Sequence, residues 1–571
     1  MKYLFLLILA GLVVLSVLTW RSLPESLSPV PVLYWVTDAN PAREDQIHLF
    51  HLWQVKNGYT TSIQLESAEE TERFLQNQGR FFRRSLLEIN PDLQSPRSAN
   101  YPLTITLPQA ELRLDTANAD VTKRIIQGVS NVGGDIMDMW SGLHMWQMQG
   151  MGLLRDVTED AKRLNFGPDR TYGAILPEIA IPDSQGRWHQ YQFPCNVVSS
   201  AYFVNLEQIK KAGMPPPPRT WTIAEFEAYG SEYVKRANQG LDRPRYFLIN
   251  GIDNQILRRS FGASELNETM TACTIDDPRN VQAMKTYLRW QNDLKIIPSA
   301  VDRAGFATDS GYGGQDAQLF NAGNYAMLFT GRYLLIQFRK FNLDRVRSGK
   351  PPMELGFSEP PYNVFPNTNI GTRAAAVYSG GKHQDLSVLF LSYLASEDYN
   401  MQIVYDADSL PPNPVYTRTK DYLTPDPDPS RGVYPQTEYA VHGPFAEITQ
   451  TIAVANNHSP FILQAVVMRE IGYADDAIIN GVLSPEQAYA NAARRVNTEI
   501  ALNLTENPRL KPLYDRKIEQ QKQIDDMKEA ILRFQSQNPD TAVPAELRIP
   551  LNLIDNPFHR AYYRKIGWIK E

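Results

Sequence analysis

The fold is decided first by residues 32–40, which read VLYWVTDAN. The apolar and aromatic residues Val32–Val36 predict a buried strand, and the polar residues after them predict the loop that ends it. Pro41 stands at a favourable first helical position behind Asn40 as the cap, and the apolar residues that follow continue one helical face: Ile47, Phe50 and Trp53. The sequence therefore predicts a strand, a polar loop and a helix in that order.

The same order recurs further along the chain. Extended segments are predicted at 103–107 and 110–114, a helix at 120–129, and a short strand at 135–139 that ends at Trp140. Such alternation is typical of α/β lobes with largely parallel sheets. In these sheets ligands bind beyond the carboxyl ends of the strands, which is where we expect Asp38 and Trp140 to lie.

Other segments extend this outline. Residues 60–100 are rich in charge, and we interpret them as an insertion with one helix. Capping signals predict helices that begin behind Thr222 and Ser484. A last helix is expected from about Arg516 to Phe534. Its apolar stripe packs on the body of the protein or, as the alternative, pairs with a partner helix: Ile524, Met527, Ile531 and Phe534. The basic and aromatic tail, 559–570, is expected to dock on the protein surface, with lipid headgroups as the alternative.

The composition is that of an ordinary globular protein with a large core. The 571 residues are 43% hydrophobic and 21% charged, and 57 Lys and Arg against 63 Asp and Glu give a formal charge of -6. The hydrophobic content excludes intrinsic disorder. The mildly acidic balance argues against nucleic-acid binding, because that binding depends on neutralising phosphates. The length suggests several domains, and two large lobes with extensions satisfy the same prior.

The amino terminus carries a hydrophobic run of membrane-spanning length. Residues 3–20 are apolar or weakly polar, with Lys2 before them and Arg21 after them, and a helix of this length spans roughly 27 Å. The run is longer than the core of a secretory signal and lacks a good cleavage site, so we predict an uncleaved anchor over residues 1–22 rather than a cleaved signal peptide. Leu12 stands where a lipoprotein box has Cys, which excludes lipid anchoring. Lys2 places the amino terminus in the cytoplasm and the rest of the chain outside.

The common catalytic and metal-binding motifs do not occur in the sequence. The two cysteines, Cys195 and Cys273, leave no CxxC site, and we interpret them as buried thiols, with a single disulfide as the alternative. His48 and His51 form only an i, i+3 pair, so no metal or other cofactor is predicted. Neither a P-loop nor a GxSxG motif is present. A glycosidase needs only two carboxylates, so that class stays open.

Aromatic residues favour a carbohydrate ligand. They make up 11% of the chain, with 9 Trp and 28 Tyr, and several stand at predicted strand ends beside Asp, Asn, Ser or Arg. A sugar ring has an apolar face that stacks on aromatic rings and hydroxyls that need polar partners. Core packing is the competing explanation for any single aromatic residue.

Short motifs along the chain carry a family resemblance when they are taken in order. They are the segment 34–53, GDIMD at 134–138, GLLRDVT at 152–158, FP at 193–194 leading to AYFVN at 201–205, AGM at 212–214 with TWT at 220–222, the segment 320–333 ending in GRY, and 390–395 before Leu410 and two prolines. The chain thereby resembles the family 1 extracellular solute-binding proteins of ABC importers, the maltose-binding-like group, over about residues 32–505. The insertion at 60–100, the missing lipobox Cys and the extension after about 505 depart from that family.

This resemblance implies an α/β fold of two lobes, the periplasmic-binding-protein type II fold, with ligand held in a cleft between them. Three chain crossings are expected, near 193–196, 330–333 and 370–373. The first lobe would hold residues 32–193 and 331–371, the second 195–329 and 372–505, and residues 506–571 would form a helical extension. Both cysteines would then lie in the second lobe, where a bridge is topologically possible.

We predict ligand contacts at strand ends and at the crossings: Thr37, Asp38, Trp140, Ser141, Asn196, Tyr312, Arg332, Tyr333, Thr372 and Arg373. Asp38 would accept hydrogen bonds from sugar hydroxyls, with capping of the helix at Pro41 as the alternative. Trp140 and Tyr333 would stack on a ring, with burial in the lobe as the alternative. Arg332 would donate to hydroxyls or an anionic group, with a salt bridge near the hinge as the alternative.

These expectations describe a binding protein without catalytic residues. It would capture a carbohydrate-like solute outside the cytoplasmic membrane, close by hinge bending and present the solute to the transmembrane subunits of an ABC permease. A membrane-tethered carbohydrate-active enzyme and a ligand sensor are the alternative functions.

Overall fold

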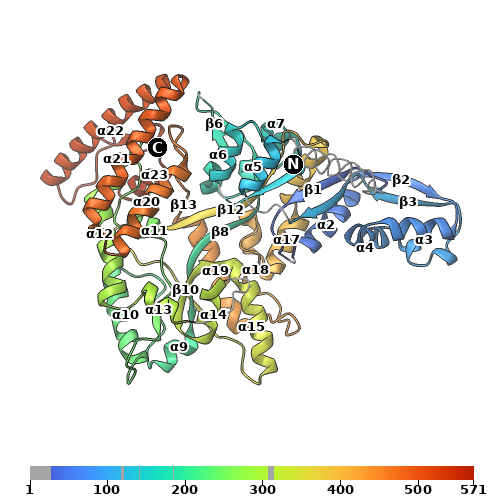
Figure 1. The fold of residues 1–571 in the computed structure, drawn as a ribbon, viewed down its shortest axis with the longest axis horizontal. Helices are drawn as coiled ribbons and strands as arrows, with labels where there is room; N and C mark the ends of the chain where they lie inside the picture. The colour runs from blue at the N-terminus through green and yellow to red at the C-terminus, as the bar shows by residue number, and fades with distance from the viewer. Residues whose placement is uncertain are drawn as a thin grey trace, which may run out of the picture. The chain divides into compact units, whose positions relative to one another are not determined.

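The computed structural model describes residues 28–40, 42–116, 121–130, 132–140, 142–183, 185–306 and 314–571. The chain divides into two compact units, which are described separately (Figure 1). One unit comprises the residues up to Met137 together with Gly380–Tyr393, and the other comprises Asp138–Ser379 together with Leu394–Glu571.

The first unit is built around the strand that the sequence predicts at its start. Strand β1 (Val32–Val36) pairs in parallel with β4 (Glu111–Asp115) and with β5 (Ile136–Met139). Helix α2 (Ala42–Lys56) follows, and the Ala42 amide donates to Asn40 Oδ1 at 3.0 Å, so Asn40 caps the helix as expected. The predicted strands and the helix α5 (Val121–Val129) are confirmed within a residue or two of each boundary.

An aromatic cluster holds α2 on the β1 side of this unit. Phe50 of α2 and Trp35 of β1 are fully buried, and both contact Phe390 of α16 (Gln384–Leu394), with ring centroids 5.4 and 4.9 Å away. The hydroxyl of Tyr393 donates to the Gln46 carbonyl at 2.9 Å. The apolar spacing in the sequence therefore marks the packed face of α2 correctly.

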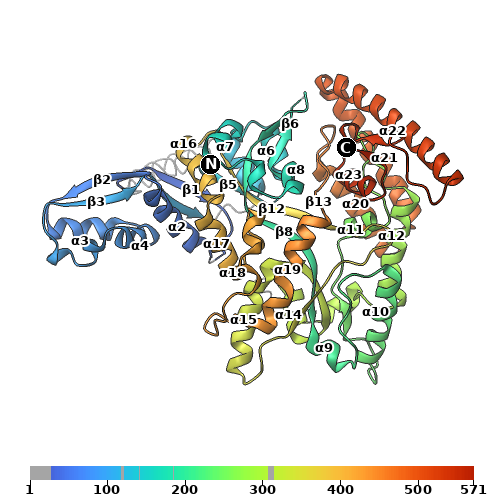
Figure 2. The same cartoon turned by 180° about the vertical axis from the view of Figure 1, so that it is seen from behind.

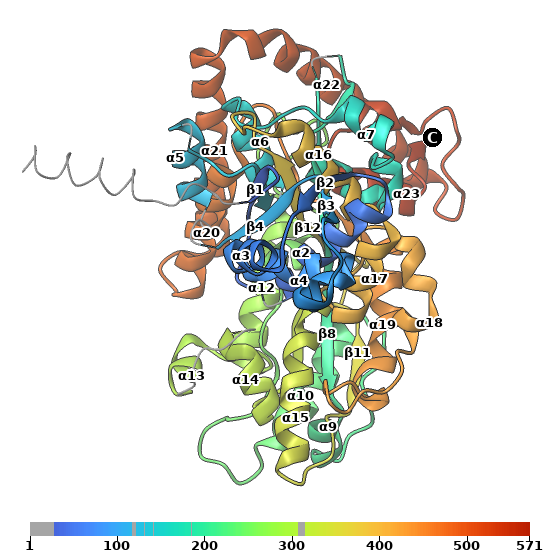
Figure 3. The same cartoon turned by 90° about the vertical axis from the view of Figure 1, so that its right-hand side faces the viewer.

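Residues 60–108 form a small module of two strands and two helices. Strands β2 (Thr60–Leu65) and β3 (Leu103–Pro108) pair antiparallel, and α3 (Ala68–Asn77) and α4 (Arg80–Ile89) pack beside them (Figure 3). The expectation of one helix in this insertion was wrong. Helix α3 ends before Gln78, and a second helix, α4, begins at Arg80 without a side-chain cap. A hydrophobic core unites the module: Val30, Leu65, Leu75, Phe82, Leu86, Leu93, Ile105 and Leu107.

The two histidines of α2 form hydrogen bonds within this unit. His48 Nδ1 and His51 Nδ1 lie 2.9 and 3.0 Å from Ser85 Oγ, and His51 Nε2 accepts from the Leu112 amide at 2.9 Å. Burial lowers the pKa of His51 to about 3, so its imidazole is neutral. Within the described ranges, no group of three or more His, Cys, Asp or Glu residues is placed to hold a metal ion.

The second unit is organised by one long strand, β8 (Gln192–Asn205). The first half of β8 pairs antiparallel with β12 (Thr368–Val377) (Figure 2). The second half pairs antiparallel with β10 (Tyr325–Gly331) and β11 (Leu355–Ser358). Strand β9 (Phe247–Ile249) adds in parallel to β10, and β13 (Ala453–Val454) adds in parallel to β12. The predicted crossings at 193–196 and 370–373 lie on β8 and β12, which pair with each other. The one at 330–333 begins at the end of β10, which also pairs with β8, so all three stretches lie inside this unit.

Residues after the second crossing pack with the second half of β8. Helix α15 (Leu335–Arg347) and β11 share a core with Phe203 and Phe320, whereas the sequence assigns 331–371 to the first lobe. Residues 380–393 likewise belong to the unit of β1, although the sequence places 372–505 in the second lobe. The sequence pattern shows where strands occur but not to which neighbour each strand adds.

Both capping boxes predicted from the sequence are present. Thr222 and Glu225 open α10 (Ile223–Ala237), and Ser484 and Gln487 open α21 (Pro485–Glu506). The other elements of this unit are short or cover the sheet: α6 (Gly142–Gly150), α7 (Thr158–Leu164), α8 (Leu176–Ile179), β6 (Ala180–Pro182), β7 (Trp188–Gln190), α9 (Leu206–Lys211), α11 (Asn254–Ser260), α12 (Pro278–Leu288), α13 (Ala300–Ala304), α14 (Gly314–Ala322), α17 (Glu397–Asp406), α18 (Lys420–Leu423), α19 (Pro435–Thr451) and α20 (Gln464–Ile479).

The carboxyl-terminal extension folds onto the second unit. Helix α22 (Lys511–Gln537) buries Ile524 and Ile531 against residues of β14 (Ile549–Pro550), β15 (Ile569–Lys570) and their neighbours. The buried Glu268 carboxylate accepts from Lys528 Nζ at 2.6 Å and from Gln521 Nε2 at 2.8 Å. Helix α23 (Pro557–Lys565) places Phe558 against Phe365. The packed apolar stripe and the docked tail agree with the sequence predictions.

The hydrophobic run at residues 3–20 lies outside the described residues, and so does the anchor predicted from it. Among the helices that the structure does describe, none has both the length and the apolar character needed to cross a bilayer.

Candidate functional site

The centre of β8 has one accessible face and one covered face. Val198 and Ser200 are partly exposed, whereas Ser199 and Ala201 between and beyond them are buried. Side chains alternate across a strand, so the two pairs point to opposite faces of the sheet. On the covered face Ser199 and Thr449 of α19 share a hydrogen bond between hydroxyls. The other face is partly exposed at Val198 and Ser200.

Strand β12 continues this open strand face. Gly371 pairs with Val198 and Ile370 pairs with Ser199. Gly371 and Asn369 are partly exposed, while Ile370 is buried. A Cβ atom added at Gly371 would meet no atom within 4 Å, so the space above this position is empty. We define the open strand face by these four partly exposed residues: Val198, Ser200, Asn369 and Gly371.

An aromatic ring borders the open strand face. A Cβ atom at Gly331 would lie within 3.0 Å of the Tyr333 ring and of Val198, so this ring lies across Gly331 and beside Val198. The Tyr333 hydroxyl accepts from Thr330 Oγ1 at 3.1 Å, which fixes the ring. Because Tyr333 is only half-buried, part of its ring stays available for stacking.

Polar side chains that sequence reasoning missed lie beside this face. Asp253 Oδ2 accepts from Asn369 Nδ2 at 3.4 Å, and Asp253 Oδ1 caps α11 by accepting from the Gln255 amide at 2.8 Å. Asn250 Oδ1 accepts from the Phe329 amide at 2.8 Å. Asn250 and Asp253 follow the carboxyl end of β9, a parallel strand, so the same strand-end rule that selected Asp38 points to them. The short run Phe247–Ile249 is the signal that identifies them.

Arg373, predicted as a ligand contact, is buried in an ion-pair cluster. Its side chain is only 3% exposed, and it donates to Asp138 Oδ2 and lies 3.7 Å from Asp408 Oδ2. The Cys195 thiol donates to Asp138 Oδ1 at 3.6 Å. Burial disfavours the charged guanidinium, yet its electrostatic interactions with Cys195, Asp138 and their neighbours raise the pKa of Arg373 well above the ordinary value. Arg373 is therefore a charged residue inside the protein rather than at its surface.

Arg332 is buried in a second network. Its Nε donates to His442 Nδ1 at 2.9 Å, it donates to the Ser409 carbonyl, and its guanidinium lies 4.5 Å from the centroid of the Tyr422 ring. His442 Nε2 lies 3.1 Å from Glu438 Oε2. Burial, and then the Arg332 charge, lower the pKa of His442 to about 4, so the imidazole is neutral and donates to Glu438. Arg332 therefore bonds inside the protein, but its described partners are a neutral imidazole, a backbone carbonyl and a tyrosine ring rather than the carboxylate of the expected salt bridge.

One turn with a left-handed backbone contacts both arginines. Ala407 and Ser409 have φ of 58° and 68°, in the left-handed region that costs free energy for residues other than glycine. The turn places Asp408 beside Arg373 and the Ser409 carbonyl beside Arg332. Leu410 then exchanges two backbone hydrogen bonds with Val197 of β8, at 2.9 and 3.0 Å. The strained turn thus joins both networks to the strand that carries the open face.

The other predicted contacts have varied surroundings. Asn196 and Thr372 are buried, and Thr372 Oγ1 donates to the Asn196 carbonyl at 2.6 Å. Trp140 follows β5 and is 37% exposed. The remaining predicted residues lie in the other unit or outside the described residues. Thr37 is buried and donates its amide to the Asp115 carbonyl, Asp38 accepts from Arg43 Nε at 2.8 Å, and Ser141 and Tyr312 are not described.

The helix that begins just after Trp140 already holds a carboxylate at its amino terminus. Glu178 Oε2 accepts from the Gly142 amide of α6, and Glu178 Oε1 lies 3.3 Å from both the Asn456 amide and His458 Nε2. Burial works against the charged carboxylate, but His458 and these amides lower its pKa. Because a helix amino terminus attracts anions, Glu178 fills the position that an anionic ligand would take.

Both cysteines are buried free thiols, which confirms the interpretation from the sequence. Cys195 lies on β8, and burial raises the pKa of Cys273 to about 12. A thiol with a raised pKa is a poor nucleophile, so Cys273 has a packing role.

The fold is mixed α/β, and it carries a partly exposed strand face on β8. The chain belongs to the family of bacterial extracellular solute-binding proteins, whose sequence profile matches residues 117–427, more than half of its length. This confirms the resemblance and the fold class expected from the motifs. No curated protein sequence matches the chain significantly.

Solved structures share this fold at low sequence identity. An ABC substrate-binding protein from Listeria monocytogenes in complex with cycloalternan is 16% identical, with 83% of this chain and 99% of that chain covered and a TM-score of 0.57. A solute-binding protein from Thermotoga lettingae bound with α-D-tagatose is 16% identical, with coverages of 82% and 100% and a TM-score of 0.56. The sugar-binding protein MalE from Xanthomonas citri is 13% identical, with coverages of 83% and 99% and a TM-score of 0.54.

Asp138→Asn tests whether the Arg373 cluster stabilises the second unit. The substitution leaves the buried Arg373 guanidinium without its nearest carboxylate, so we expect the free energy of unfolding to fall by about 3 kcal/mol. Urea unfolding followed by tryptophan fluorescence measures this change. Glu159→Gln is the control, because Glu159 forms an exposed pair with Lys162 and should change stability by less than about 1 kcal/mol. Equal unfolding midpoints for Asp138→Asn and the wild type would contradict the assignment.

The neutral His442 makes stability depend on pH. Its pKa is about 4 when folded and 6.5 as the ordinary value, so the unfolded chain binds the proton first as the pH falls. The stability that the neutral imidazole contributes is complete above pH 6.5 and is lost as the pH falls towards 4. Melting temperature measured between pH 7 and pH 4 should therefore fall less steeply in His442→Gln than in the wild type. Parallel curves for the two proteins would show that His442 does not cause the loss.

Proposed function

We propose that the protein is the solute-binding component of an ABC import system and that it captures a carbohydrate-like solute on the open strand face. Membership of an extracellular solute-binding family places it outside the cytoplasm. The observation that carries the choice of site is the alternation along β8 and β12, which leaves Val198, Ser200, Asn369 and Gly371 accessible on one face. The ligand leaves unchanged and passes to the transmembrane subunits of the permease.

The residues around this face suit a neutral polyhydroxy compound. Tyr333 offers part of a ring for stacking, and Ser200, Asn369 and Asp253 offer hydroxyl, amide and carboxylate groups for sugar hydroxyls. Glu178 at the start of α6 adds negative charge near Trp140, which disfavours an anionic ligand there. Micromolar binding corresponds to roughly 8 kcal/mol, which one or two stacked rings and several hydrogen bonds can supply.

The three crossings supply a hinge for this proposal. Residues 193–196, 330–333 and 370–373 fall on or next to β8, β10 and β12, whose pairing keeps them together. Bending of the backbone at these strands would close the two lobes over the solute. The ligand shifts the population towards the closed form only by the difference between its affinities for the two forms.

The hydrophobic residues 3–20 supply a membrane anchor in this proposal. We infer that residues 1–22 stay attached and hold the binding protein at the outer surface of the cytoplasmic membrane, beside the permease. Because the proposed carrier is tethered, it would need to move only a short distance to deliver its solute.

Gly371→Trp tests the location of the site. A Cβ atom at Gly371 meets nothing within 4 Å and the φ of Gly371 lies outside the left-handed region, so a side chain can begin there without backbone strain, and we expect the indole to extend over the open strand face. We expect calorimetric affinity for a bound glycan, found by screening a panel of mono- and oligosaccharides, to fall at least tenfold while the melting temperature stays unchanged. Gly472→Trp is the control, since Gly472 on α20 is equally open but far along the chain from this face. Normal binding by Gly371→Trp would remove the open strand face as the site.

Recovery of the ligand after the same binding experiment separates capture from catalysis. Chromatography of the ligand after incubation should recover the glycan intact, whereas a glycosidase with two suitably spaced carboxyl groups would release products.

Trp140→Ala tests whether the exposed indole contacts the ligand. Removal of a stacking ring should cost about 1–3 kcal/mol of binding free energy and leave the melting temperature nearly unchanged, because the side chain is 37% exposed. Trp188→Ala is the matched control, with 38% exposure on β7. If Trp140→Ala binds glycan normally but melts well below the wild type, Trp140 belongs to the core instead.

A further inference from the structure

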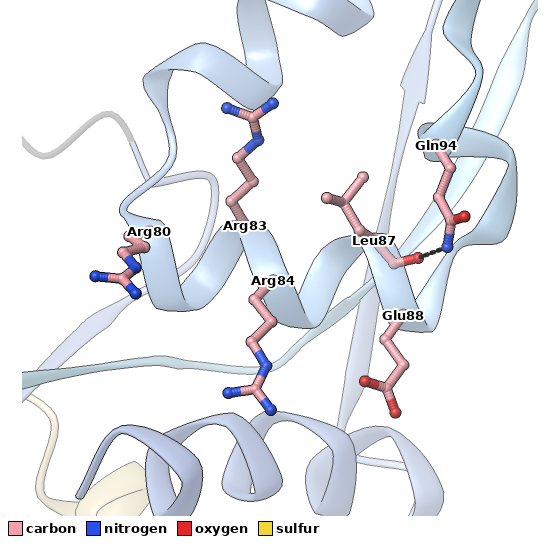
Figure 4. Close-up of a pocket in the computed structure, with 6 residues that line it drawn as sticks. All are labelled: Arg80, Arg83, Arg84, Leu87, Glu88 and Gln94. Atoms are coloured by element: carbon pink, nitrogen blue, oxygen red, sulfur yellow. Dashed lines mark hydrogen bonds between the residues drawn. The ribbon is translucent and has the colours of Figure 1, made fainter. Parts of the chain in front are cut away.

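Helix α4 of the 60–108 module presents a basic surface that solute binding does not use. A hollow of about 470 Å³ runs along this helix, lined by Arg80, Arg83, Arg84, Leu87, Glu88 and Gln94 (Figure 4). We call the first three of these residues the α4 arginine face. All three arginine side chains are exposed. The module precedes the residues that match the family, which begin at 117.

The α4 arginine face is electrostatically unfavourable for the helix that carries it. The amino terminus of a helix is its positive end, and the first turn of α4 contains no acidic residue. Arg80 also lies three and four positions before Arg83 and Arg84, where like charges repel. Helix α3 has the opposite and favourable arrangement, with Ser67 as a cap and Glu69 and Glu70 in its first turn. The module therefore concentrates positive charge on α4 at a cost to its own stability.

Partners within the protein neutralise only part of this charge. Arg84 pairs with Asp45 at 2.7 Å, and Glu88 lies 2.9 Å from His48 Nε2. Arg80 and Arg83 form no salt bridge with any residue that the structure describes, and the Arg80 guanidinium lies 5.8 Å from the centroid of the Phe81 ring. Two guanidinium groups are thus available for an anion, and guanidinium forks fit phosphate oxygens well.

The inner side of α4 ties the module to the amino-terminal end of the chain. Phe82 and Leu86 pack in the same core as Val30. Val30 follows Trp20, the last residue of the hydrophobic run, by ten positions, which reach at most about 35 Å when fully extended. If residues 3–20 enter the membrane, Val30 stays within this reach of the lipid headgroups, and the module that carries the α4 arginine face shares its core with Val30.

We propose that the α4 arginine face docks on the phosphodiester headgroups of anionic phospholipids in the membrane that holds the amino terminus. This inference rests on the proposed membrane anchor. Attraction between basic side chains and an anionic bilayer acts over about a Debye length, so the anchor supplies proximity and the arginines supply the contact. The docked module would then fix how the tethered binding protein stands on the membrane.

The test uses the full chain in nanodiscs of neutral phosphatidylcholine, with or without anionic phosphatidylglycerol. Ser95→Cys next to Gln94 carries a fluorescent donor, and the two native cysteines are buried, so the donor is confined to this exposed position. Energy transfer to an acceptor on the lipid headgroups reports docking. We expect strong transfer with anionic lipid, and R80Q/R83Q should lower the ratio of docked to free module roughly 30-fold.

Two controls separate lipid docking from a change in net charge and from a loss of folding. R243Q/R245Q removes two exposed arginines from a loop of the other unit, so it changes net charge equally and should leave energy transfer unchanged. The melting temperature of R80Q/R83Q should not fall, because unfavourable charges are removed, and its glycan affinity should match the wild type. Equal transfer in neutral and anionic discs, or transfer that survives R80Q/R83Q, would overturn lipid docking and leave solute capture unaffected.

Discussion

The structure depends on one constraint, the pairing of both halves of β8 with different partners. A 14-residue strand is more than twice the usual length, and here its first half belongs with β12 and its second half with β10 and β11. Because side chains alternate, the central residues of β8 present one face to α19, and Val198 and Ser200 on the other face are partly exposed. The candidate site is a consequence of this alternation, and Gly371 keeps its centre free of side chains.

Two buried arginines help to hold β8 through a turn that pairs with its backbone. Arg373 and Arg332 reach different parts of the turn at 407–410, which returns two backbone hydrogen bonds to Val197. Buried arginines contribute little net stability compared with apolar residues, but removing one partner leaves an uncompensated charge. These networks therefore specify one arrangement of β8, β12 and the turn. We infer that both arginines act on the geometry of the site and that Tyr333 and the side chains of the open strand face contact the solute.

The sequence predicts the local elements of this protein better than it predicts which strands pair and which side chains pack together. The apolar run at Val32–Val36, the cap at Asn40 and the boxes at Thr222 and Ser484 each depend on residues close in the chain, and all are present. Only one helix was expected where α3 and α4 stand, because α4 begins with arginines and no side-chain cap, and so the break between the two helices carries no start signal. The grouping of β11 with the second half of β8 was missed because pairing between distant strands leaves no mark in a single sequence.

Arg373 was chosen from the family resemblance, but only its surroundings reveal that it is buried. Asn250 and Asp253 were predictable in principle, since they follow the short strand β9.

The most direct measurement is the position of a bound glycan in a crystal of the complex. We predict an intact glycan over Val198, Ser200, Asn369 and Gly371, with a ring against Tyr333. A glycan bound on another surface, or found cleaved, would contradict it.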